Sequence, residues 1–330
     1  MSTRIPKDLP MSAKRPVVID LKFSRVAMDE ALKDAFPDRE VIDLARPDHA
    51  GRDLGSAAYA LLWKPDPALF KRATALEVLF SGGAGVDHIL ALPDLPDRPI
   101  VRFVDRSLTD RMSEWVVMNC LYHLRQMAAY QKQQREKIWH EIPLQPEARD
   151  VTVGVMGLGV LGEDAARKLK VMGFNVIGWS RRKKTLEGME TFDEDHMDDF
   201  LARTDILVGL LPLTSETRGL YDSSLFARLR QGGPLGKPVF LNAGRGGSQV
   251  EADVIIALQK GVLGAASLDV FEKEPLAADS PLWAMENVVI TPHAAAASDV
   301  SALIRHVEAQ IHRFEAGEPL EHVVDRWAGY

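Results

Sequence analysis

The sequence of 330 residues has little of several features that would place it in a class directly. It contains one cysteine, Cys120, so no internal disulfide can form, which excludes a disulfide-rich scaffold and is consistent with a reducing compartment. No run of about eighteen consecutive apolar residues is present, and the amino terminus lacks the apolar run of a signal peptide. We therefore expect a cytoplasmic protein without a membrane segment, with residues 1–14 disordered.

An excess of positive charge is also absent. The chain has 40 Lys and Arg residues against 47 Asp and Glu residues, a formal net charge of -7 at pH 7, and no basic stripe. We expect no nucleic-acid partner, since such a partner needs a basic surface. We expect no metal site either. The hydrophobic fraction of 46% and the charged fraction of 26% are those of a soluble globular protein, and the length favours two domains.

The most informative stretch that is present is VTVGVMGLGVLG, residues 151–162. An apolar strand runs directly into Gly157, Gly159 and Gly162. In a βαβ unit of this kind the first glycine makes a tight turn, the second lets the backbone approach a pyrophosphate, and the third allows close packing of helix on strand. A helical stretch that ends at Gly173 and a second apolar strand follow. The pattern predicts a dinucleotide site. Its expected contacts are Gly157, Leu158, Gly159, Val160, Leu161 and Gly162.

The order of the remaining segments predicts the fold class. Between residues 16 and 105, short apolar runs alternate with helical stretches, which is typical of a parallel sheet with crossover helices. After the glycine motif the apolar runs lack a polar alternation, as expected for strands covered on both faces. These strands are expected over residues 174–179, 205–211, 239–242, 265–269 and 288–291. We expect an α/β protein with two Rossmann-like, doubly wound parallel-sheet domains and a cleft between them.

Helical spacing predicts one long helix over residues 109–137, capped by Thr109 or Asp110. Cys120 lies on its apolar stripe and is expected to be a buried small residue rather than a reactive thiol. A proline-containing loop over 139–150 follows. Near the carboxyl terminus we expect an amphipathic helix over 297–315, and a tail that returns to the first domain.

A second glycine-rich turn follows the expected strand 76–80. It reads SGGAGVDHIL, residues 81–90, and its glycines free the backbone to turn sharply before a helix near Val86. Successive exposed N–H groups at the end of a strand form an anion site without a charged side chain, and a substrate carboxylate would fit at Ala84 and Gly85. The alternative is a plain turn from strand to helix.

Four further motifs follow the glycine motif. They are LPLTSETRGL (211–220), NAGRGG (242–247), SLDVFEKEPL (267–276) and TPHAAAAS (291–298). In this order they resemble the D-isomer-specific 2-hydroxyacid dehydrogenases, and GAGVDHI with WSRR resembles the glyoxylate/hydroxypyruvate reductase branch. The resemblance covers nearly all of residues 56–315. It implies a nucleotide-binding domain over 106–294, inserted in a substrate domain made of 1–105 and 295–330. It also implies a homodimer, in which the 139–150 loop and the preceding helix would form a contact.

The resemblance further implies three catalytic residues. Arg245 would hold the carboxylate and carbonyl oxygen of a 2-oxo acid, His293 would be the general acid, and Glu274 would orient that histidine. These residue types suit these roles. A guanidinium presents a planar fork of donors that matches a carboxylate and polarises a carbonyl. Histidine can donate a proton to a forming alkoxide near neutral pH, and an adjacent carboxylate favours the imidazolium that reduction needs.

Further contacts follow from the same resemblance. Asp269 would lie near the nicotinamide amide, with a strand-end turn as the alternative reading. Leu211, Pro212, Thr217 and Ala243 would line the cofactor. In the first domain, Trp63 matches a tryptophan that walls the substrate pocket in related reductases, which would restrict the site to short 2-oxo acids. A core role for Trp63 is equally open.

The end of the second strand indicates which dinucleotide binds. An NAD site would have an acid on the ribose hydroxyls about twenty residues beyond the glycines. Here the strand ends in Ser180, Arg181 and Arg182, so the acid is missing and two cations follow. We expect NADP(H) rather than NAD(H), with Arg181 as the main contact to the 2′-phosphate. The alternative is that residues 181–184 are a solvated run of charge.

The leading hypothesis is an NADPH-dependent reductase that converts small 2-oxo acids to D-2-hydroxy acids. Two alternatives stay open. One is a dehydrogenase of formate or phosphite, although formate dehydrogenases of this family replace the acid that pairs with the histidine, and Glu274 is present here. The other is a nucleotide-sensing, co-repressor-like binding protein of the same fold, which would also retain Arg245, Glu274 and His293.

Overall fold

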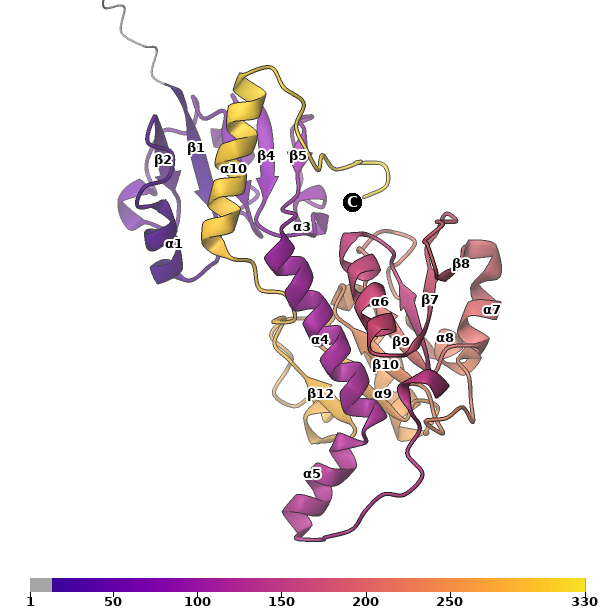
Figure 1. The fold of residues 1–330 in the computed structure, drawn as a ribbon. Helices are drawn as coiled ribbons and strands as arrows, with labels where there is room; N and C mark the ends of the chain where they lie inside the picture. Colours follow the sequence, from indigo (N-terminus) through magenta and orange to yellow (C-terminus); the bar gives the residue numbers. More distant parts are fainter. Residues whose placement is uncertain (1–13, 330) are drawn as a thin grey trace, which may run out of the picture. The chain divides into compact units, whose positions relative to one another are not determined.

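The structure, a computed structural model, describes residues 14–329. The disorder expected for the amino terminus concerns residues outside this range, apart from Lys14, which begins strand β1 (Lys14–Asp20). The described chain forms two compact units. The first unit runs to Asp105 and resumes at Ser298, and the second is continuous over Arg106–Ala297. The second unit is therefore inserted in the first along the sequence (Figure 1).

The first unit contains a parallel sheet of five strands in the order β2-β1-β3-β4-β5. Its strands after β1 are β2 (Arg39–Asp43), β3 (Tyr59–Leu62), β4 (Val78–Ser81) and β5 (Ile100–Val101). Its helices are α1 (Arg25–Leu32), α2 (Leu69–Arg72), α3 (Asp87–Leu90) and α10 (Val300–Glu315). All four residues of β3 and of β4 are buried, as expected for strands covered on both faces.

The carboxyl-terminal tail returns to this sheet, as the sequence predicted. Val323 forms an antiparallel bridge with Val101, and the N–H of Val324 donates to the carbonyl of Ile100 over 2.8 Å. The guanidinium of Arg326 donates to the carbonyls of Pro96 and Arg98. The two separate segments of the first unit are thus joined along the edge of one sheet.

The second unit contains a parallel sheet of seven strands in the order β12-β11-β10-β9-β6-β7-β8. The strands are β6 (Thr152–Met156), β7 (Asn175–Trp179), β8 (Glu190–Phe192), β9 (Ile206–Gly209), β10 (Val239–Asn242), β11 (Ala265–Leu268) and β12 (Val288–Ile290). The helices are α4 (Arg106–Leu124), α5 (Met127–Glu136), α6 (Val160–Val171), α7 (Met197–Ala202), α8 (Ser223–Arg228) and α9 (Glu251–Gln259). The strand order reverses between β6 and β9, which is the doubly wound arrangement. The expected α/β class with two parallel sheets is confirmed.

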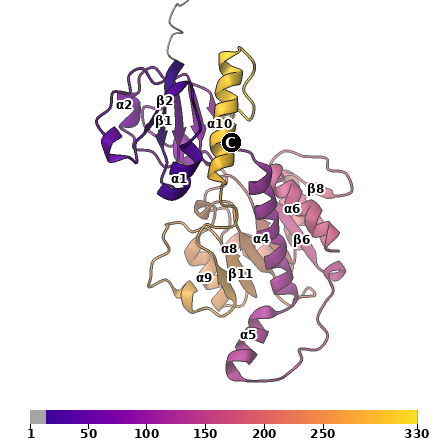
Figure 2. The same cartoon turned by 60° about the vertical axis from the view of Figure 1, so that its left-hand side comes forward.

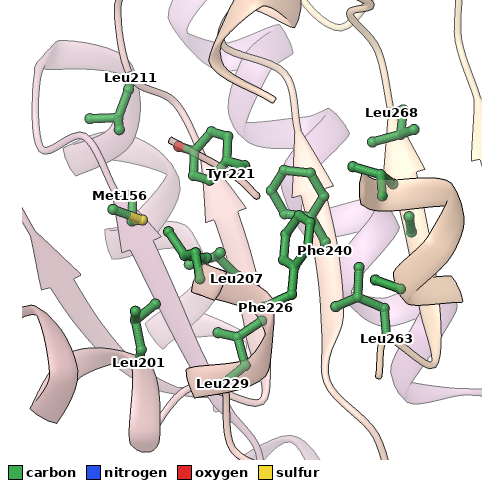
Figure 3. Packing of buried hydrophobic residues seen from close by; sticks show 14 of the residues in the cluster. Met156, Leu201, Leu207, Leu211, Tyr221, Phe226, Leu229, Phe240, Leu263 and Leu268 are labelled. Carbon is green, nitrogen blue, oxygen red and sulfur yellow. The ribbon is translucent and has the colours of Figure 1, made fainter. Parts of the chain in front are cut away.

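One face of this sheet is packed by a cluster of large side chains (Figure 3). Tyr221, Phe226 and Phe240 are fully buried, and the ring centroids of Phe226 and Phe240 lie 5.1 Å apart. The other face is covered by α4 and α6, which lie side by side (Figures 1 and 2). Burial of apolar surface on both faces accounts for the uninterrupted apolar runs of the strands.

The prediction of a single helix over residues 109–137 is wrong. The chain forms α4 and α5, and Gln126 between them has φ 52° and ψ 40°, in the left-handed region. The apolar stripe that packs α4 against α6 ends at Leu124, and α5 contains no buried residue. Packing therefore supports a straight helix only as far as Leu124. The expected caps are also wrong, because α4 begins at Arg106 and Thr109 is buried within the helix.

Cys120 is fully buried on α4, as expected, and burial raises the pKa of its thiol. The edge strand β8 was not predicted. It has only three residues and pairs on one side with β7, so its sequence carries little apolar signal.

A buried ion network joins the end of α10 to the first sheet. The Arg39 guanidinium, whose side chain is 0% exposed, donates to both carboxylate oxygens of Glu315 over 2.8 and 3.0 Å. The Tyr59 hydroxyl donates to the same carboxylate over 3.0 Å. Hydrogen bonds from Arg39 and then Tyr59 lower the pKa of Glu315 from 4.5 to about 2. The two parts of the first unit are thus joined by charge as well as by the tail.

We predict that Glu315→Gln lowers the free energy of unfolding of the first unit by about 1.5–3 kcal/mol at pH 7, because a buried guanidinium loses its carboxylate. The folded pKa of Glu315 lies below its ordinary value. Its contribution is therefore complete above about pH 4.5 and is lost as the pH falls towards 2. Urea denaturation at pH 7 and near pH 3 measures both effects.

Glu318→Gln is the matched control, since Glu318 is exposed and pairs with Arg313 over 3.5 Å; it should change stability little. An equal difference between wild type and Glu315→Gln at both pH values would contradict the assignment.

Candidate functional site

The glycine motif forms the turn from β6 to α6. Gly157 has φ 105°, in the left-handed region, and a Cβ there would lie 2.6 Å from the carbonyl oxygen of Leu210. A Cβ at Gly162 would lie 1.8 Å from the carbonyl oxygen of Gly157, so the helix packs directly on the turn. At Gly159 a Cβ would meet no heavy atom within 4 Å. Two glycines are therefore required by the fold, while the third keeps space open at a helix amino terminus, where phosphate is favoured.

This turn lies at the carboxyl end of β6, where the strand order of the sheet reverses towards β9. Open α/β sheets bind ligands at such a point. The Leu158 side chain is buried against Gly178 of β7, and Val160 and Leu161 form the first turn of α6. The residues expected to hold a dinucleotide thus form one continuous turn from strand to helix, with open space beside Gly159.

The cationic segment after β7, residues 181–184, contains cations with different surroundings. The Ser180 hydroxyl donates to the carbonyl of Arg182 over 2.7 Å, which makes a tight turn at the strand end. The Arg181 guanidinium lies 3.9 Å from the Glu216 carboxylate, a distance at the outer limit of an ion pair. Arg182 and Lys183 are exposed.

Lys184 was not predicted to have a role at this site. Its ammonium donates to the carbonyl of Leu158 in the glycine motif over 2.7 Å and to the Glu163 carboxylate over 2.8 Å. Glu163 also accepts from Arg167, and these two cations lower its pKa. Lys184 therefore ties the cationic segment to the glycine turn through two hydrogen bonds, although its side chain is 41% exposed.

Arg245 lies in the loop after β10. The buried Asn242 organises this loop: its amide donates to the carbonyl of Arg245 over 3.2 Å and to Gln249 over 2.9 Å, and its oxygen accepts from the N–H of Gly244 over 3.0 Å. Gln249 in turn donates to the carbonyl of Val270 over 3.2 Å, in the loop after β11. Neither Asn242 nor Gln249 was singled out in the sequence, because a buried amide has no distinctive spacing.

Two glycines hold neighbouring loops in contact. A Cβ at Gly246 would lie 1.9 Å from the carbonyl oxygen of Phe271, and a Cβ at Gly244 would lie 2.8 Å from that of Leu211. The loop that carries Arg245 is therefore packed on the backbone of the loops that follow β9 and β11. Only glycine allows both approaches.

Glu274 and His293 are paired. The Nδ1 atom of His293 lies 3.0 Å from Oε1 and 2.9 Å from Oε2 of Glu274. Oε1 of Glu274 also accepts from the N–H of Phe271 over 3.3 Å. The His293 side chain is 37% exposed. A carboxylate at Nδ1 favours the tautomer with hydrogen on that atom when the ring is neutral, and it leaves Nε2 for another partner.

The carboxylate of Asp269 is buried and faces the loop of His293. It accepts from the Thr291 hydroxyl over 2.5 Å and from the N–H groups of Ala294 and Ala295 over 2.8 and 3.0 Å. The carbonyl of Asp269 accepts from the N–H of His293 over 2.8 Å. In this structure Asp269 therefore anchors the histidine loop.

The remaining expected cofactor contacts follow β9 and β10. Leu211 is buried, and the Thr217 hydroxyl donates to the carbonyl of Pro212 over 2.6 Å, which closes a turn. Ala243 is buried and its N–H donates to the carbonyl of Gly209 over 3.2 Å. The structure thus brings residues of four expected motifs together at the carboxyl ends of β9 to β12.

In the first unit, Trp63 follows β3 and the SGGAG turn follows β4. A Cβ at Gly83 would lie 2.6 Å from Cζ3 of Trp63, and a Cβ at Gly82 would lie 2.9 Å from Cδ2 of Leu21. Gly82 and Gly83 do not have left-handed φ values. The expectation that they free the backbone to turn is therefore wrong: they are needed because side chains approach closely.

The indole of Trp63 is held by further rings. Its centroid lies 4.4 Å from that of His88 and 6.2 Å from that of Phe23. In the turn, Ser81 Oγ donates to the carbonyl of Gly85 over 2.9 Å and accepts from the N–H of Gly83 over 3.3 Å. The N–H of Gly83, one of the groups in the turn that was expected to bind an anion, is thus used within the turn.

Within residues 14–329, no helix combines the length and the apolar character that a membrane crossing needs. Over the same range, no group of three or more His, Cys, Asp or Glu side chains is arranged to hold a metal ion.

Taken together, the second unit has a glycine turn at a helix amino terminus and, on the same edge of its sheet, an arginine loop packed against the loop that carries Glu274, whose carboxylate pairs with His293. This combination defines a dinucleotide-dependent oxidoreductase. Residues 117–295 match the family model described as D-isomer specific 2-hydroxyacid dehydrogenase, NAD binding domain. The chain belongs to the D-isomer-specific 2-hydroxyacid dehydrogenase family, as the motifs predicted.

Relatives of known structure extend the match over the whole fold. An NADPH-dependent glyoxylate/hydroxypyruvate reductase from Sinorhizobium meliloti, solved with NADP and sulfate, is 63% identical, with a TM-score of 0.94 over 96% of this chain and 100% of that one. A probable 2-hydroxyacid dehydrogenase from Rhizobium etli, solved with NADP, HEPES and tartaric acid, is 64% identical, with a TM-score of 0.91 over the same shares. Glyoxylate/hydroxypyruvate reductase A of Escherichia fergusonii is 38% identical over 91% of this chain and 95% of its own. The predicted branch is confirmed.

We predict that Gly162→Ala and Gly159→Ala separate folding from binding. A methyl group at position 162 would meet the backbone of Gly157, so the melting temperature should fall by several degrees. At position 159 the methyl group has space, so stability should be kept while dinucleotide affinity falls about tenfold or more. Thermal melts without ligand and dinucleotide titrations measure the two effects. Unchanged affinity in Gly159→Ala would contradict the role of that position.

Proposed function

We propose that this protein is an NADPH-dependent reductase of small 2-oxo acids, of the glyoxylate and hydroxypyruvate type, that forms D-2-hydroxy acids. The observation that carries this proposal is the pairing of His293 Nδ1 with both carboxylate oxygens of Glu274. The loop of Glu274 is packed against the neighbouring loop, which carries Arg245. The second unit would be the nucleotide-binding domain and the first the substrate domain.

Each group has a defined task in this reaction. The turn from Gly157 to Gly162 would hold the dinucleotide, which would supply a hydride for the carbonyl carbon. Arg245 binds the carboxylate and the carbonyl oxygen, and its charge stabilises the negative charge that develops on that oxygen. His293 donates a proton from Nε2 to the same oxygen, while Glu274 accepts from Nδ1 and holds the ring in orientation. Glu274 is thus a positioning residue, and one hydride and one proton account for the two hydrogens gained.

The choice of NADP(H) over NAD(H) has two supports. The end of β7 has Ser180 and two arginines where an NAD site would have an acid. Three of the similar solved proteins, at 63%, 64% and 39% identity, were crystallised with NADP or NADPH. Arg181 is proposed as the main contact to the 2′-phosphate, because the one ion-pair partner it has among residues 14–329, Glu216, lies at 3.9 Å.

The preference for short acids is proposed from the packing of Trp63. Gly83, His88 and Phe23 hold this large ring at the carboxyl end of a strand. A ring fixed in this way would form a rigid wall for a substrate bound near Ala84 and Gly85.

Of the two alternatives, a formate dehydrogenase is disfavoured by the paired Glu274, since the formate enzymes of this family replace that acid. A nucleotide sensor would retain the pair, so turnover decides between a sensor and an enzyme. A sensor would bind NADPH and reduce no 2-oxo acid at a useful rate.

We further propose a homodimer formed through α5 and the loop after it. Trp139 and Leu144 of that loop are fully exposed, and Met127 and Ile138 are partly so, which is a concentration of apolar surface that a monomer would leave in water. This segment extends away from the sheet of the second unit (Figures 1 and 2).

For this dimer, light scattering should give twice the mass of one chain. The mass of a single chain would refute the proposal. A cytoplasmic location is proposed as well, since the one cysteine, Cys120, can form no internal disulfide, which is consistent with a reducing compartment.

We predict that wild-type protein reduces glyoxylate and hydroxypyruvate with NADPH more efficiently than phenylpyruvate. His293→Gln should lower kcat by about 10²- to 10⁴-fold and keep NADPH affinity, because it removes only the proton donor. A panel of 2-oxo acids assayed with both NADPH and NADH measures the substrate preference. Steady-state kinetics and an NADPH titration of His293→Gln measure the loss of kcat and the retained affinity. Unchanged turnover in His293→Gln would remove this residue from the mechanism. Preference for phenylpyruvate would contradict the wall role of Trp63.

We predict that Arg181→Ala lowers kcat/KM for NADPH about 10- to 100-fold and leaves that for NADH nearly unchanged, because a charged hydrogen bond to the 2′-phosphate is lost. Lys183→Ala is the control: it removes an exposed cation two residues away and should have little effect. Similar efficiency with the two cofactors, unaltered by Arg181→Ala, would refute the cofactor assignment.

A further inference from the structure

A chain of hydrogen bonds leads from helix α4 to the loop of His293. The indole N–H of Trp115, on α4, donates to the Thr291 hydroxyl over 3.1 Å. That hydroxyl donates to Oδ1 of Asp269 over 2.5 Å. Trp115 and Asp269 are 7% and 1% exposed, so both ends of the chain are shielded from water. Each hydrogen bond has one possible direction, because an indole N–H only donates and a carboxylate only accepts.

Asp269, at the end of this chain, holds three consecutive backbone positions, two through its carboxylate and one through its backbone carbonyl. The N–H of Ala294 donates to Oδ1 of Asp269 over 2.8 Å, and the N–H of Ala295 donates to both oxygens over 3.0 Å. The N–H of His293 donates to the carbonyl of Asp269 over 2.8 Å. The position of the loop therefore depends on where the Asp269 carboxylate lies.

The backbone at His293 needs such support. Its φ is 54°, in the left-handed region, which a residue with a side chain adopts at a cost in free energy. The same residue has its ring aligned with Glu274. If the anchoring at Asp269 relaxed, the backbone would leave this conformation and the ring would lose its alignment.

We propose that Thr291 and Trp115 are positioning residues for the proton-donating ring of His293 and act through the carboxylate of Asp269. The proposal rests on the function proposed above, in which His293 is the general acid. Three donors fall on Oδ1, and a single one falls on Oδ2. The Thr291 hydroxyl thus fixes the oxygen that holds the loop, and Trp115 fixes the hydroxyl.

The test uses a pair of variants at one position. Thr291→Val keeps the size of the side chain and removes the hydroxyl, whereas Thr291→Ser keeps the hydroxyl. With NADPH and glyoxylate, Thr291→Val should lower kcat about 10- to 100-fold, since small misplacement of a reacting group has effects of this size. KM for glyoxylate and the affinity for NADPH should change by less than about threefold. Thr291→Ser should restore kcat to within about threefold of wild type.

Two physical readouts distinguish positioning from general packing. The solvent isotope effect on kcat should rise in Thr291→Val, because proton transfer becomes slower relative to other steps, and it should return in Thr291→Ser. Amide hydrogen exchange of residues 293–295 should be faster in Thr291→Val but not in Thr291→Ser.

A second pair of variants tests the tryptophan. Trp115→Phe should lower kcat, as Thr291→Val does. Trp283→Phe, which removes an indole N–H bonded to the carbonyl of Ala277, should leave kcat unchanged.

Wild-type kcat in Thr291→Val would overturn the proposal, as would an equal loss in Thr291→Val and Thr291→Ser, which would indicate packing. A loss of NADPH affinity as large as the loss of kcat would overturn it as well, because it would indicate a cofactor contact. If His293→Gln keeps wild-type turnover, the proposed function loses its general acid and this inference fails with it. If His293→Gln loses turnover while Thr291→Val does not, only this inference is wrong.

Discussion

The candidate site depends on direct contact between loop backbones at one edge of the second sheet. All seven strands of this sheet are parallel, so the loops after β6, β9, β10 and β11 leave it at the same edge. Side chains would keep these loops apart. At Gly157, Gly244 and Gly246 an added Cβ would lie 1.9 to 2.8 Å from a carbonyl oxygen of a neighbouring loop. The absence of side chains at three positions therefore allows the loop of Arg245, the loop of Glu274 and the glycine turn to lie in direct contact with neighbouring loop backbones.

Much of this arrangement was predictable from the sequence, since spacing and order carried the information. The three glycines of the motif have a fixed interval and a strand before them, and each has the structural setting that the interval implies. The pairing of Glu274 with His293 followed from a family resemblance, because nineteen residues separate the two and no local pattern links them. The buried strands were predicted within one or two residues, because uninterrupted apolar runs have few other interpretations.

What the sequence did not indicate depends on contacts between distant positions. The break at Gln126 occurs where the surface of α6 no longer covers the helix, although helical spacing continues. Asn242 and Lys184 each make their contacts through one polar side chain. In the sequence such a residue cannot be distinguished from a polar residue that lies in solvent. Gly83 was expected to let the backbone turn, whereas a side chain is excluded there because the indole of Trp63 lies too close. In each case the partner, rather than the residue type, determines the role.

The run of cations after β7 illustrates how one sequence feature can serve two physical tasks. In the part of the chain that the structure describes, the Arg181 guanidinium has one carboxylate near it, that of Glu216 at 3.9 Å, which suits the proposed role of Arg181 as an anion contact. Lys184, three residues later, has two close partners on the glycine turn and on α6, one of which is a carboxylate. Its charge offsets that of Glu163, which stands in the first turn of the helix, where the helix dipole already favours an anion. Without Lys184, Glu163 would oppose the binding of a phosphate by like-charge repulsion. The segment therefore places cations at the end of β7, where the proposed cofactor site needs them, and uses Lys184 to neutralise the nearby carboxylate of Glu163.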